Sequence, residues 1–521
     1  MSNAITNITN LNSLDNDLLT LSTDVASLDS RVTSLETSVE SLETPFGSIQ
    51  RRVPSRFVRG IGNTRTDIFP LSVKYPGPGG VEVNKTPLEL AKSLENVIAR
   101  QNEADMWVSP SGAGTQAGDT RANAMSWTTA FRTSTAGRRL LMIDTAGTYP
   151  PLSLLSGTHA GAAVPKWLYS VDGRVRIQAD TSLGQPATQT WTLHSGAVYK
   201  TVLTSADYDR PQAVLKTLVP NVRDGEPDSM QQYASVAELT ALGSNAEGWV
   251  FDASVDTLYV TYYGSNLTVA GNRSFKIIYS SKTLDSVGDI SAEWLLGGCT
   301  VILEGSFDLD GVWINSKEVN NTLPIFIAEG RLKQLCATGY GIRAEGLTYT
   351  SGRRCYRPKN DGLNGYKSSM NNVVGMTIEH DLVVTGAGDI VTYGTAGPHN
   401  KQGFSAHGAH NAMIFGALLE GNDGQGWADI CDSTHNSASW GVGVIVRDNY
   451  VDAGISNGIY MDGSSGGGTG GRFAWLDTCT SYANTRDLVS VASAVKTVNC
   501  SLTTQVVVSG GSVTSYSPET P

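Results

Sequence analysis

The sequence predicts a mainly β protein whose body is a parallel β-helix, a solenoid of stacked turns, preceded by an N-terminal α-helical coiled coil. Three observations carry this prediction: an unbroken heptad pattern near the N-terminus, short β-rich runs separated by Gly, Asn, Asp and Ser from Trp107 onward, and a five-residue motif that recurs between 341 and 462. We therefore expect four segments: a coiled coil at 1–44, a neck at 45–105, the β-helix at 106–508 and a polar C-terminal tail at 509–521.

Composition excludes several classes of protein. The chain has 521 residues, of which 40% are hydrophobic and 17% charged, with a formal net charge of −11. A net negative chain without clustered cations does not predict a nucleic-acid partner. No apolar run approaches the ~20 residues that span a bilayer, so we expect no membrane insertion. The six cysteines lack CxxC or metal-ligand spacing, so we expect buried thiols, synthesis in a reducing cytoplasm, and neither a metal nor another cofactor.

The heptad pattern predicts a coiled coil. Ten apolar residues from Leu11 to Leu42 follow a 3-4-3-4 spacing without a break, which is a narrower stripe than a helix packed on its own domain usually shows. Val at a and Leu at d favour two strands. Arg31 and Glu36, however, occupy the g and following e positions and resemble the Arg-h-x-x-h-Glu signature of three-stranded coils. We expect a homotrimer in which this pair helps to set register and partner number.

Pro45 and Gly47 end the heptads, and the neck that follows carries arginines among glycines and prolines. Two interpretations stay open: a solvated flexible arm, or a contact with an acidic neighbouring protein. The segment Thr86–Gln101 is predicted to form a short helix, with Thr86 as the cap and Pro87 in the first turn.

The recurring motif predicts the solenoid. Copies beginning at Gly341, Gly362, Gly403 and Gly458, with a looser one at Gly426, each read glycine, large apolar, variable, small or apolar, then polar or aromatic. Period-2 alternation places the second and fourth residues inside and the third and fifth outside. The intervals of 21, 41, 23 and 32 residues predict single turns, one double turn and one turn with an inserted loop. An antiparallel sandwich or jelly roll is the alternative, disfavoured by the scarcity of two-residue hairpin signals.

Residues 187–264 show clearer alternation of apolar and polar residues and more aromatic residues than the rest of the body. This pattern predicts a small antiparallel β insertion.

The segment from Met106 to Gly118 resembles the opening turn of right-handed β-helix proteins of the pectate-lyase-like superfamily, which implies a right-handed helix. The whole chain resembles a tail spike or tail-fibre receptor-binding protein of a tailed bacteriophage. That resemblance implies a virion protein made in the host cytoplasm, attached to other tail or baseplate proteins through its N-terminal region, and bound to a bacterial surface polysaccharide.

Carboxylates and imidazoles on the outward face suggest depolymerase chemistry. Glycoside hydrolysis needs two carboxyl groups about 5–5.5 Å or about 6.5–9.5 Å apart, and neighbouring turns stack at about 4.8 Å. Five of the seven histidines lie between 380 and 435. The candidate catalytic residues are Asp361, Asp389, His407, Asp429 and Asp462. Asn360-Asp361-Gly362 and His407-Gly408 resemble motifs of polygalacturonase-like hydrolases, but the remaining motifs of that family are not found. A lyase would instead need a cation placed specifically beside a uronate.

Each candidate also has a structural interpretation. Asp361 lies in a turn sequence, Asp389 is at a position where a strand begins, and His407 suits a surface or sugar-stacking role. Asp429 is either an outward carboxylate or an Asx turn. The candidate sugar-stacking residues are Tyr366, Trp427 and Tyr460, of which Trp427 is equally consistent with the core. The open alternatives are a depolymerase, a non-catalytic receptor-binding fibre and a structural virion component.

The heptad pattern generates a testable prediction. The intact protein should have the mass of three chains in light scattering under native conditions, because the a and d residues of 1–44 are buried only between helices. A monomeric or dimeric mass would contradict it. Deletion of 1–44 is not a sufficient test, since packed β-helices can hold a trimer together by themselves.

Overall fold

A computed structural model describes most of the chain from Met106 onward and a short piece before it. The described residues are 73–76, 82–85, 106–133, 139–145, 147–178, 188–203, 211–220, 226–279, 292–366, 375–388, 401–408, 410–430, 437–449, 457–464 and 472–516. The predicted coiled coil with Arg31 and Glu36, the helix predicted at 86–101, and Asp389 lie outside the described residues.

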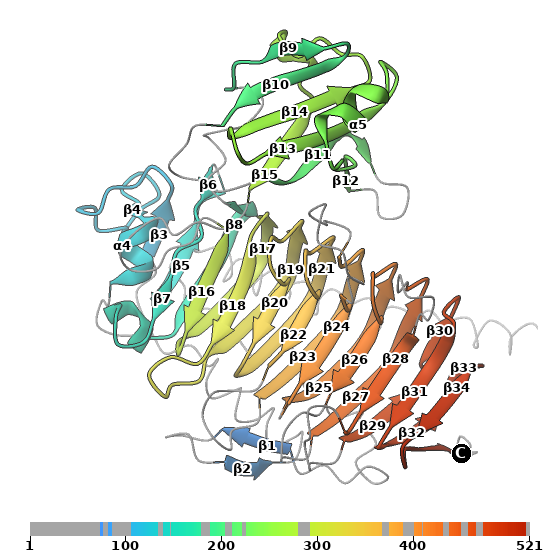
Figure 1. Cartoon of the computed structure of the whole chain (residues 1–521). Helices are drawn as coiled ribbons and strands as arrows, with labels where there is room; N and C mark the ends of the chain where they lie inside the picture. The colour runs from blue at the N-terminus through green and yellow to red at the C-terminus, as the bar shows by residue number, and fades with distance from the viewer. Residues whose placement is uncertain are drawn as a thin grey trace, which may run out of the picture. The chain divides into compact units, whose positions relative to one another are not determined.

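The fold is mainly β, with two long parallel sheets (Figure 1). The ten-stranded sheet contains, in order, β34 (Gln505–Val508), β31 (Arg486–Val491), β28 (Asn457–Asp462), β26 (Trp427–Ile430), β24 (Phe404–His407), β22 (Leu363–Gly365), β20 (Ile342–Ala344), β18 (Trp313–Lys317), β16 (Glu293–Gly297) and β7 (Leu154–Leu155).

The sixteen-stranded sheet contains, in order, β35 (Ser512–Tyr516), β32 (Ser493–Val498), β29 (Arg472–Asp477), β27 (Ser437–Arg447), β25 (His410–Glu420), β23 (Gly375–Thr385), β21 (Leu347–Tyr356), β19 (Ile325–Leu335), β17 (Thr300–Asp310), β8 (Lys166–Gln178), β5 (Arg139–Ile143), β3 (Met106–Ser109) and β4 (Met125–Ser126). Three short strands pair beside this path: β6 (Thr148–Tyr149), β30 (Thr480–Tyr482) and β33 (Ser501–Leu502).

Successive turns of the chain contribute one strand to each sheet, so the arrangement is solenoid-like. The register confirms the motif: Ile342 pairs with Leu363, Leu363 with Phe404, Phe404 with Trp427 and Trp427 with Ile459. These second positions face the core and are fully buried. The predicted double turn is wrong, because β22 pairs directly with β24; the 41-residue interval is one turn with long connections.

Each long strand of the sixteen-stranded sheet bends once along its length. At the bend, successive strands place residues with left-handed backbone conformation one above another in a column. Gly330 has φ +103°, and a Cβ there would lie 2.3 Å from the Gly305 carbonyl oxygen, so only glycine fits. Where the column is not glycine it contains Asp381, Thr478 or Asn499, with φ near +50°. This repeated conformation bends every turn at the same place, which keeps the turns in register.

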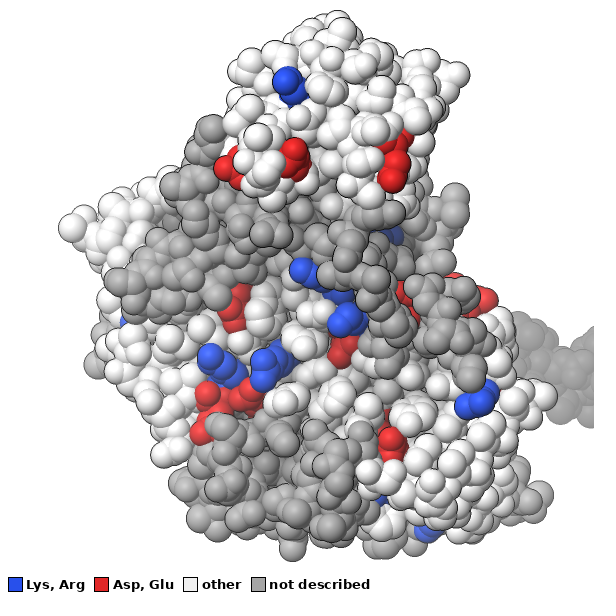
Figure 2. Space-filling model, viewed as in Figure 1, with Lys and Arg blue, Asp and Glu red and all other residues white. Residues whose placement is uncertain are grey.

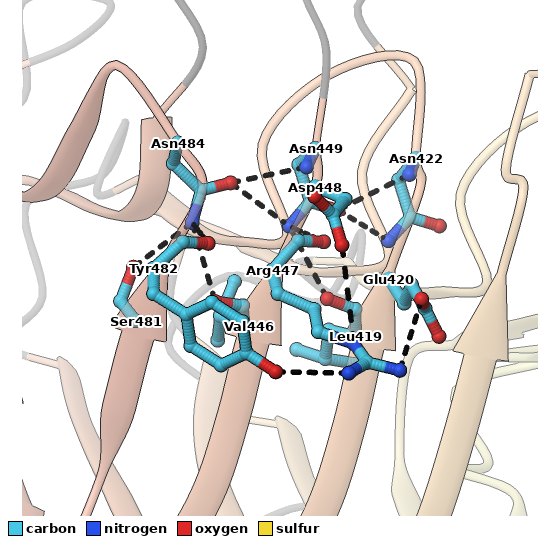
Figure 3. Close-up of polar contacts among 10 residues, drawn as sticks. All are labelled: Leu419, Glu420, Asn422, Val446, Arg447, Asp448, Asn449, Ser481, Tyr482 and Asn484. Carbon is cyan, nitrogen blue, oxygen red and sulfur yellow. Dashed lines mark hydrogen bonds and ion pairs between the residues drawn. The ribbon is translucent and has the colours of Figure 1, made fainter.

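A second corner is held by a ladder of asparagine side chains (Figure 3). Asn449 Oδ1 accepts from the backbone N of Asn422 at 3.1 Å and from its Nδ2 at 2.8 Å. Asn484 Oδ1 accepts in turn from the Asn449 backbone N at 3.0 Å. Asn449 Nδ2 donates to the carbonyls of Leu419 and Arg447. The ladder satisfies backbone groups that the turn removes from the sheets.

The chain between β8 and β16 forms antiparallel sheets with their own core around Trp249 and Val260. One sheet orders β13 (Glu247–Asp252), β14 (Thr257–Tyr262), β10 (Val198–Val202) and β9 (Thr192–Ser195); the other orders β12 (Pro227–Ser229), β11 (Pro211–Pro220) and β15 (Phe275–Tyr279). Antiparallel pairing therefore continues past the expected end at 264, to Tyr279.

Other elements are short. A hairpin pairs β1 (Val73–Pro76) with β2 (Glu82–Lys85), and the helical segments are α4 (Trp127–Arg132), α5 (Val236–Ala241), η2 (Ala160–Ala163) and η3 (Ala270–Asn272). The segment from Ser509, expected to be a polar tail, contains the largely exposed strand β35, which pairs with β32. Among the described residues, no helix has the length and apolar character needed to cross a membrane.

The asparagine ladder predicts a stability effect. Asn449→Ala should lower the free energy of unfolding by about 1–3 kcal/mol, because it leaves the buried Asn422 backbone N–H without its partner and removes the side-chain donor from the Leu419 carbonyl. Denaturant titration measures this. The exposed Asn272→Ala is the matched control and should stay within about 0.5 kcal/mol of wild type. Equal stability of the two variants would show that the ladder is dispensable.

Candidate functional site

One outward row of the ten-stranded sheet carries an unusual run of polar side chains. The register aligns Asn315 with Arg343, Arg343 with Asn364 and Asn364 with Ser405. The row continues through Ala428 to Tyr460. From Arg343 onward these are the third positions of the motif, which the sequence placed on an exposed face; Asn364, Ser405 and Ala428 are instead buried. Neighbouring side chains in such a row lie about one strand spacing, 4.8 Å, apart, which suits an extended ligand running across the strands.

Three buried polar atoms of this row have no hydrogen-bond partner within the described part of the chain: Asn315 Oδ1, Asn364 Oδ1 and Arg343 Nε. Asn315 and Asn364 are each only 5% exposed. Buried polar groups are normally paired, and an unpaired one costs about 1–3 kcal/mol. The row therefore presents unused donors and acceptors for water or a polar ligand.

Two carboxyl groups flank the row. Glu293 Oε1 accepts from Asn315 Nδ2 at 2.5 Å, and Glu345 Oε1 pairs with Arg343 Nη2 at 3.1 Å. Glu345 Oε2 also accepts from the backbone N of Glu318 at 3.0 Å. Burial raises the pKa of both Glu293 and Glu345, although Asn315, Arg343 and Lys317 partly oppose the effect. A raised pKa widens the pH range over which the carboxyl group stays protonated, which is the form that can donate a proton.

Aromatic rings border the same region. The Arg343 guanidinium lies 4.7 Å from the centre of the Tyr366 ring, and the Tyr366 and His407 rings are 6.3 Å apart. On the other side, the Trp313 and Tyr340 rings are 6.0 Å apart. Trp313, Tyr340 and Tyr366 are all half-buried, so each keeps part of its surface open. Partly exposed rings beside hydrogen-bonding groups are the usual lining of a ligand site. We call Glu293, Asn315, Arg343, Glu345 and Tyr366 the outward cluster.

The structure gives two predicted catalytic residues internal roles. Asp361 is 5% exposed and accepts hydrogen bonds from Asn364 Nδ2 at 2.8 Å, Ser405 Oγ at 2.8 Å and the Gln402 backbone N at 2.9 Å. It orients the outward row by holding Asn364 and Ser405. Asp462 is 8% exposed and accepts from Tyr460 Oη at 3.0 Å and the Ser464 backbone N at 2.8 Å. Burial and the Asp462 carboxylate raise the pKa of Tyr460 to about 12.

Trp427 lies in the core, one of the two interpretations left open for it, and Asp429 also points into the core, which corrects its prediction as an outward carboxylate or an Asx turn. Trp427 is 0% exposed and packs with Phe404. Asp429, also 0% exposed, occupies the inward fourth position and forms an ion pair with Arg472 at 2.7 Å. The Arg472 guanidinium also donates to the His410 carbonyl at 3.1 Å. The alternation of the strand assigns Asp429 inward, so this error was avoidable from the motif itself.

Tyr366 and His407 are fifth residues of their motif copies and outward, as predicted. Their rings lie close together because β22 pairs directly with β24, which the predicted double turn would have prevented. Asp389 lies outside the described residues. Sequence reasoning missed Glu293, Asn315 and Glu345 as site residues. Glu345 could have been found, since it is the fifth residue of the first motif copy. Glu293 and Asn315 belong to turns without the initial glycine, so no motif marked them.

The face turned to the viewer in Figure 2 mixes cationic and anionic side chains instead of presenting one sign of charge. This suits recognition by hydrogen bonds more than by bulk electrostatic attraction. Within the described residues, no group of three or more His, Cys, Asp and Glu side chains is arranged to hold a metal ion.

Comparison with known proteins finds only distant likeness. No family model and no curated protein matches the sequence. The solved complex of XylC with xylose aligns with 79% of this chain and 70% of its own, at 11% identity and a TM-score of 0.45. A structure described as a glycoside hydrolase aligns with 79% of this chain and 97% of its own, at 10% identity and a TM-score of 0.40. At this level neither structure bears on the function of this chain.

The position of Asp429 predicts a structural phenotype. Asp429→Ala should lower the free energy of unfolding by about 3–5 kcal/mol, because it leaves the buried Arg472 guanidinium without its counter-ion. Denaturant titration of the double variant Asp429→Leu/Arg472→Met is the control. It should recover most of the loss, since neither charge is then left buried alone. Equal stability of Asp429→Ala and wild type would show that the buried ion pair is dispensable.

Proposed function

We propose that this chain binds a polysaccharide across the outward face of the ten-stranded sheet, with the outward cluster as the centre of the site. The observation that carries the proposal is the row of unpaired buried polar atoms on Asn315, Arg343 and Asn364. Sugar hydroxyls both donate and accept hydrogen bonds, so they match an amide oxygen and a guanidinium N–H placed on adjacent turns. The half-buried rings of Trp313, Tyr340 and Tyr366 suit the C–H faces of pyranose rings.

Hydrolysis of the bound chain is a second candidate function, favoured by the raised pKa of Glu293 and Glu345. From the register, the two residues lie two strands and four positions apart, so their Cα atoms are roughly 16 Å from one another at 4.8 Å per strand and 3.3 Å per residue. Their carboxyl groups reach the adjacent residues Asn315 and Arg343, so they lie closer together than the Cα atoms. Binding is the primary proposal because it rests on the unpaired polar atoms of the row, whereas hydrolysis also needs a second carboxyl group at about 5–9.5 Å.

The wider proposal concerns the whole molecule. We infer a right-handed β-helix in a trimeric tail spike or tail fibre of a bacteriophage, attached to the virion through its N-terminal region. Support comes from the heptad pattern of 1–44 and from the stacked parallel turns. Three copies of the site on one particle would make attachment multivalent, so weak binding at each site is sufficient. A non-catalytic receptor-binding fibre and a structural virion component remain the alternatives.

Arg343→Ala should weaken polysaccharide binding tenfold or more, because it removes the unpaired Nε and the support of the Tyr366 ring. The measurement is affinity for capsular, O-antigen and exopolysaccharide preparations from a panel of bacterial strains. Arg447→Ala is the matched control: Arg447 also pairs with a glutamate, Glu420, and contacts a tyrosine, Tyr482, but it lies on the sixteen-stranded sheet. That variant should bind like wild type. Equal loss in both variants, or no binding to any preparation, would refute the proposed site.

Hydrolysis is tested with the variants Glu293→Gln and Glu345→Gln. The measurement is the release of reducing ends from the polysaccharide. If the chain is a hydrolase, at least one variant should lose a hundredfold in turnover, as loss of a general acid typically does. Wild-type activity should then fall as pH rises through the raised pKa of that glutamate, because the acid loses its proton. The exposed Asp256→Asn is the control and should keep full turnover. Wild-type binding without reducing ends identifies a non-catalytic binder.

A further inference from the structure

A separate cleft lies on the sixteen-stranded sheet. It has a volume of about 650 Å³ and is lined by Glu329, Gly330, Arg331, Ser351, Gly352, Arg354 and Tyr356, all from β19 and β21. The outward cluster belongs to the other sheet, so the two sites share no residue. A cleft of this size falls in the range of ligand sites, about 300–1,000 Å³.

The floor of the cleft is backbone. Gly330 and Gly352 both have left-handed φ values, +103° and +75°, at the corner that bends each turn. A Cβ at Gly352 would lie 2.7 Å from the Gly330 carbonyl oxygen, so neither position tolerates a side chain. The corner thus leaves a hollow between the flanking side chains, which is where a ligand can approach the backbone closely.

Two arginines in the cleft keep hydrogen-bonding capacity. Arg354 donates from Nη1 to the carbonyl oxygens of Arg353, at 2.9 Å, and Asp381, and it has no carboxylate partner within the described residues. Arg331 approaches Asp308 only to 3.9 Å, and Asp308 is shared with Arg174 at 3.7 Å. The backbone carbonyls thus orient the Arg354 guanidinium without neutralising it.

Several neighbouring cations have partners outside the cleft. Lys333, which is aligned with Arg354, forms an ion pair with Glu226, and Lys276 pairs with Asp310 at 3.1 Å. Arg357 donates to the Pro227 carbonyl at 2.8 Å. Lys333 and Arg357 thus have partners on the antiparallel segment, and Lys276 of that segment has one on β17. Arg331 and Arg354 line the cleft with Ser351, Tyr356 and the single carboxylate of Glu329, so cations outnumber anions among the lining residues.

We propose that this cleft is a second saccharide site, selective for sugars that carry a carboxylate. Guanidinium groups bind planar carboxylates with two parallel hydrogen bonds, which fixes orientation as well as charge. The Ser351 hydroxyl and the Tyr356 ring supply a hydrogen bond and an aromatic face for the rest of the sugar. The site is independent of the proposed function: it would bind uronate residues even if the outward cluster bound nothing.

Calorimetric titration of the full-length protein tests the site with two uronate tetrasaccharides, of galacturonate and of guluronate, and with a neutral galactose tetrasaccharide. We expect the uronates to bind, the neutral sugar to bind at least tenfold more weakly, and the uronate affinity to fall as salt rises from 50 to 200 mM. Arg331→Ala/Arg354→Ala should reduce uronate affinity tenfold or more.

Arg176→Ala is the matched control, because Arg176 is exposed and lies on the same outward row, aligned through Asp308 and Lys333 with Arg354. It should change the affinity less than twofold. The Arg331→Ala/Arg354→Ala variant should keep the Arg343-dependent affinity for the strain polysaccharides, which separates this proposal from the previous one. The proposal is overturned if neither uronate binds, if the neutral sugar binds equally well, if the double variant binds like wild type, or if inorganic sulfate binds with the same arginine dependence while uronates do not.

Discussion

The parallel hydrogen-bonded register between successive turns is the constraint on which the rest of this structure depends. Ile342 pairs with Leu363, and Leu363 pairs with Phe404. This register fixes, for every residue of a strand, which residues of the adjacent strands lie beside it, so equivalent residues of successive turns form columns. The position of a column in the turn then determines which residue types it can contain. Inward columns need apolar side chains, and corner columns need left-handed residues such as Gly330 or Asp381. Where a turn removes backbone groups from the sheets, the Asn422, Asn449 and Asn484 ladder supplies the missing partners.

Outward columns are free of these requirements, and so they are where function can vary. The column through Asn315, Arg343 and Asn364 uses this freedom for polar groups, while Glu293 and Glu345 add carboxyl groups beside it. On the other sheet the same freedom produces the arginines of the cleft. Stacking at one strand spacing gives both sites the same property, a line of side chains at the pitch of the turns. Such a line suits a repeating, chain-like ligand.

The interior shows that chemistry-bearing residue types do not identify a site by themselves. Arg353 and Glu379 form a fully buried ion pair, as do Arg472 and Asp429. His410 lies nearby with its Nε2 at 2.8 Å from Thr377 Oγ1, and burial, with the Arg472 charge, lowers its pKa to about 3. Its neutral form is therefore favoured in the fold. Because the unfolded chain protonates histidine near pH 6.5, this group contributes stability above that pH and loses it as pH falls toward 3.

The local sequence pattern was sufficient to predict the mainly β fold, the stacked turns and the inward and outward faces of the strands. Glycine spacing and period-2 alternation are properties of each turn alone, so they can be recognised without knowing which turns stack together. It was also enough to assign His407 and Tyr366 to the outward face, although not as neighbours, because a double turn was predicted between them. It did not identify Glu293 or Asn315, whose turns lack the motif, and it misplaced Asp429, whose ion pair is with Arg472 on a strand of the other sheet. The burial of Asp361 and the pairing of β22 with β24 across a 41-residue interval likewise depend on which turns stack together. Tertiary structure decides these points, because a side chain's solvent exposure and partners come from turns distant in sequence.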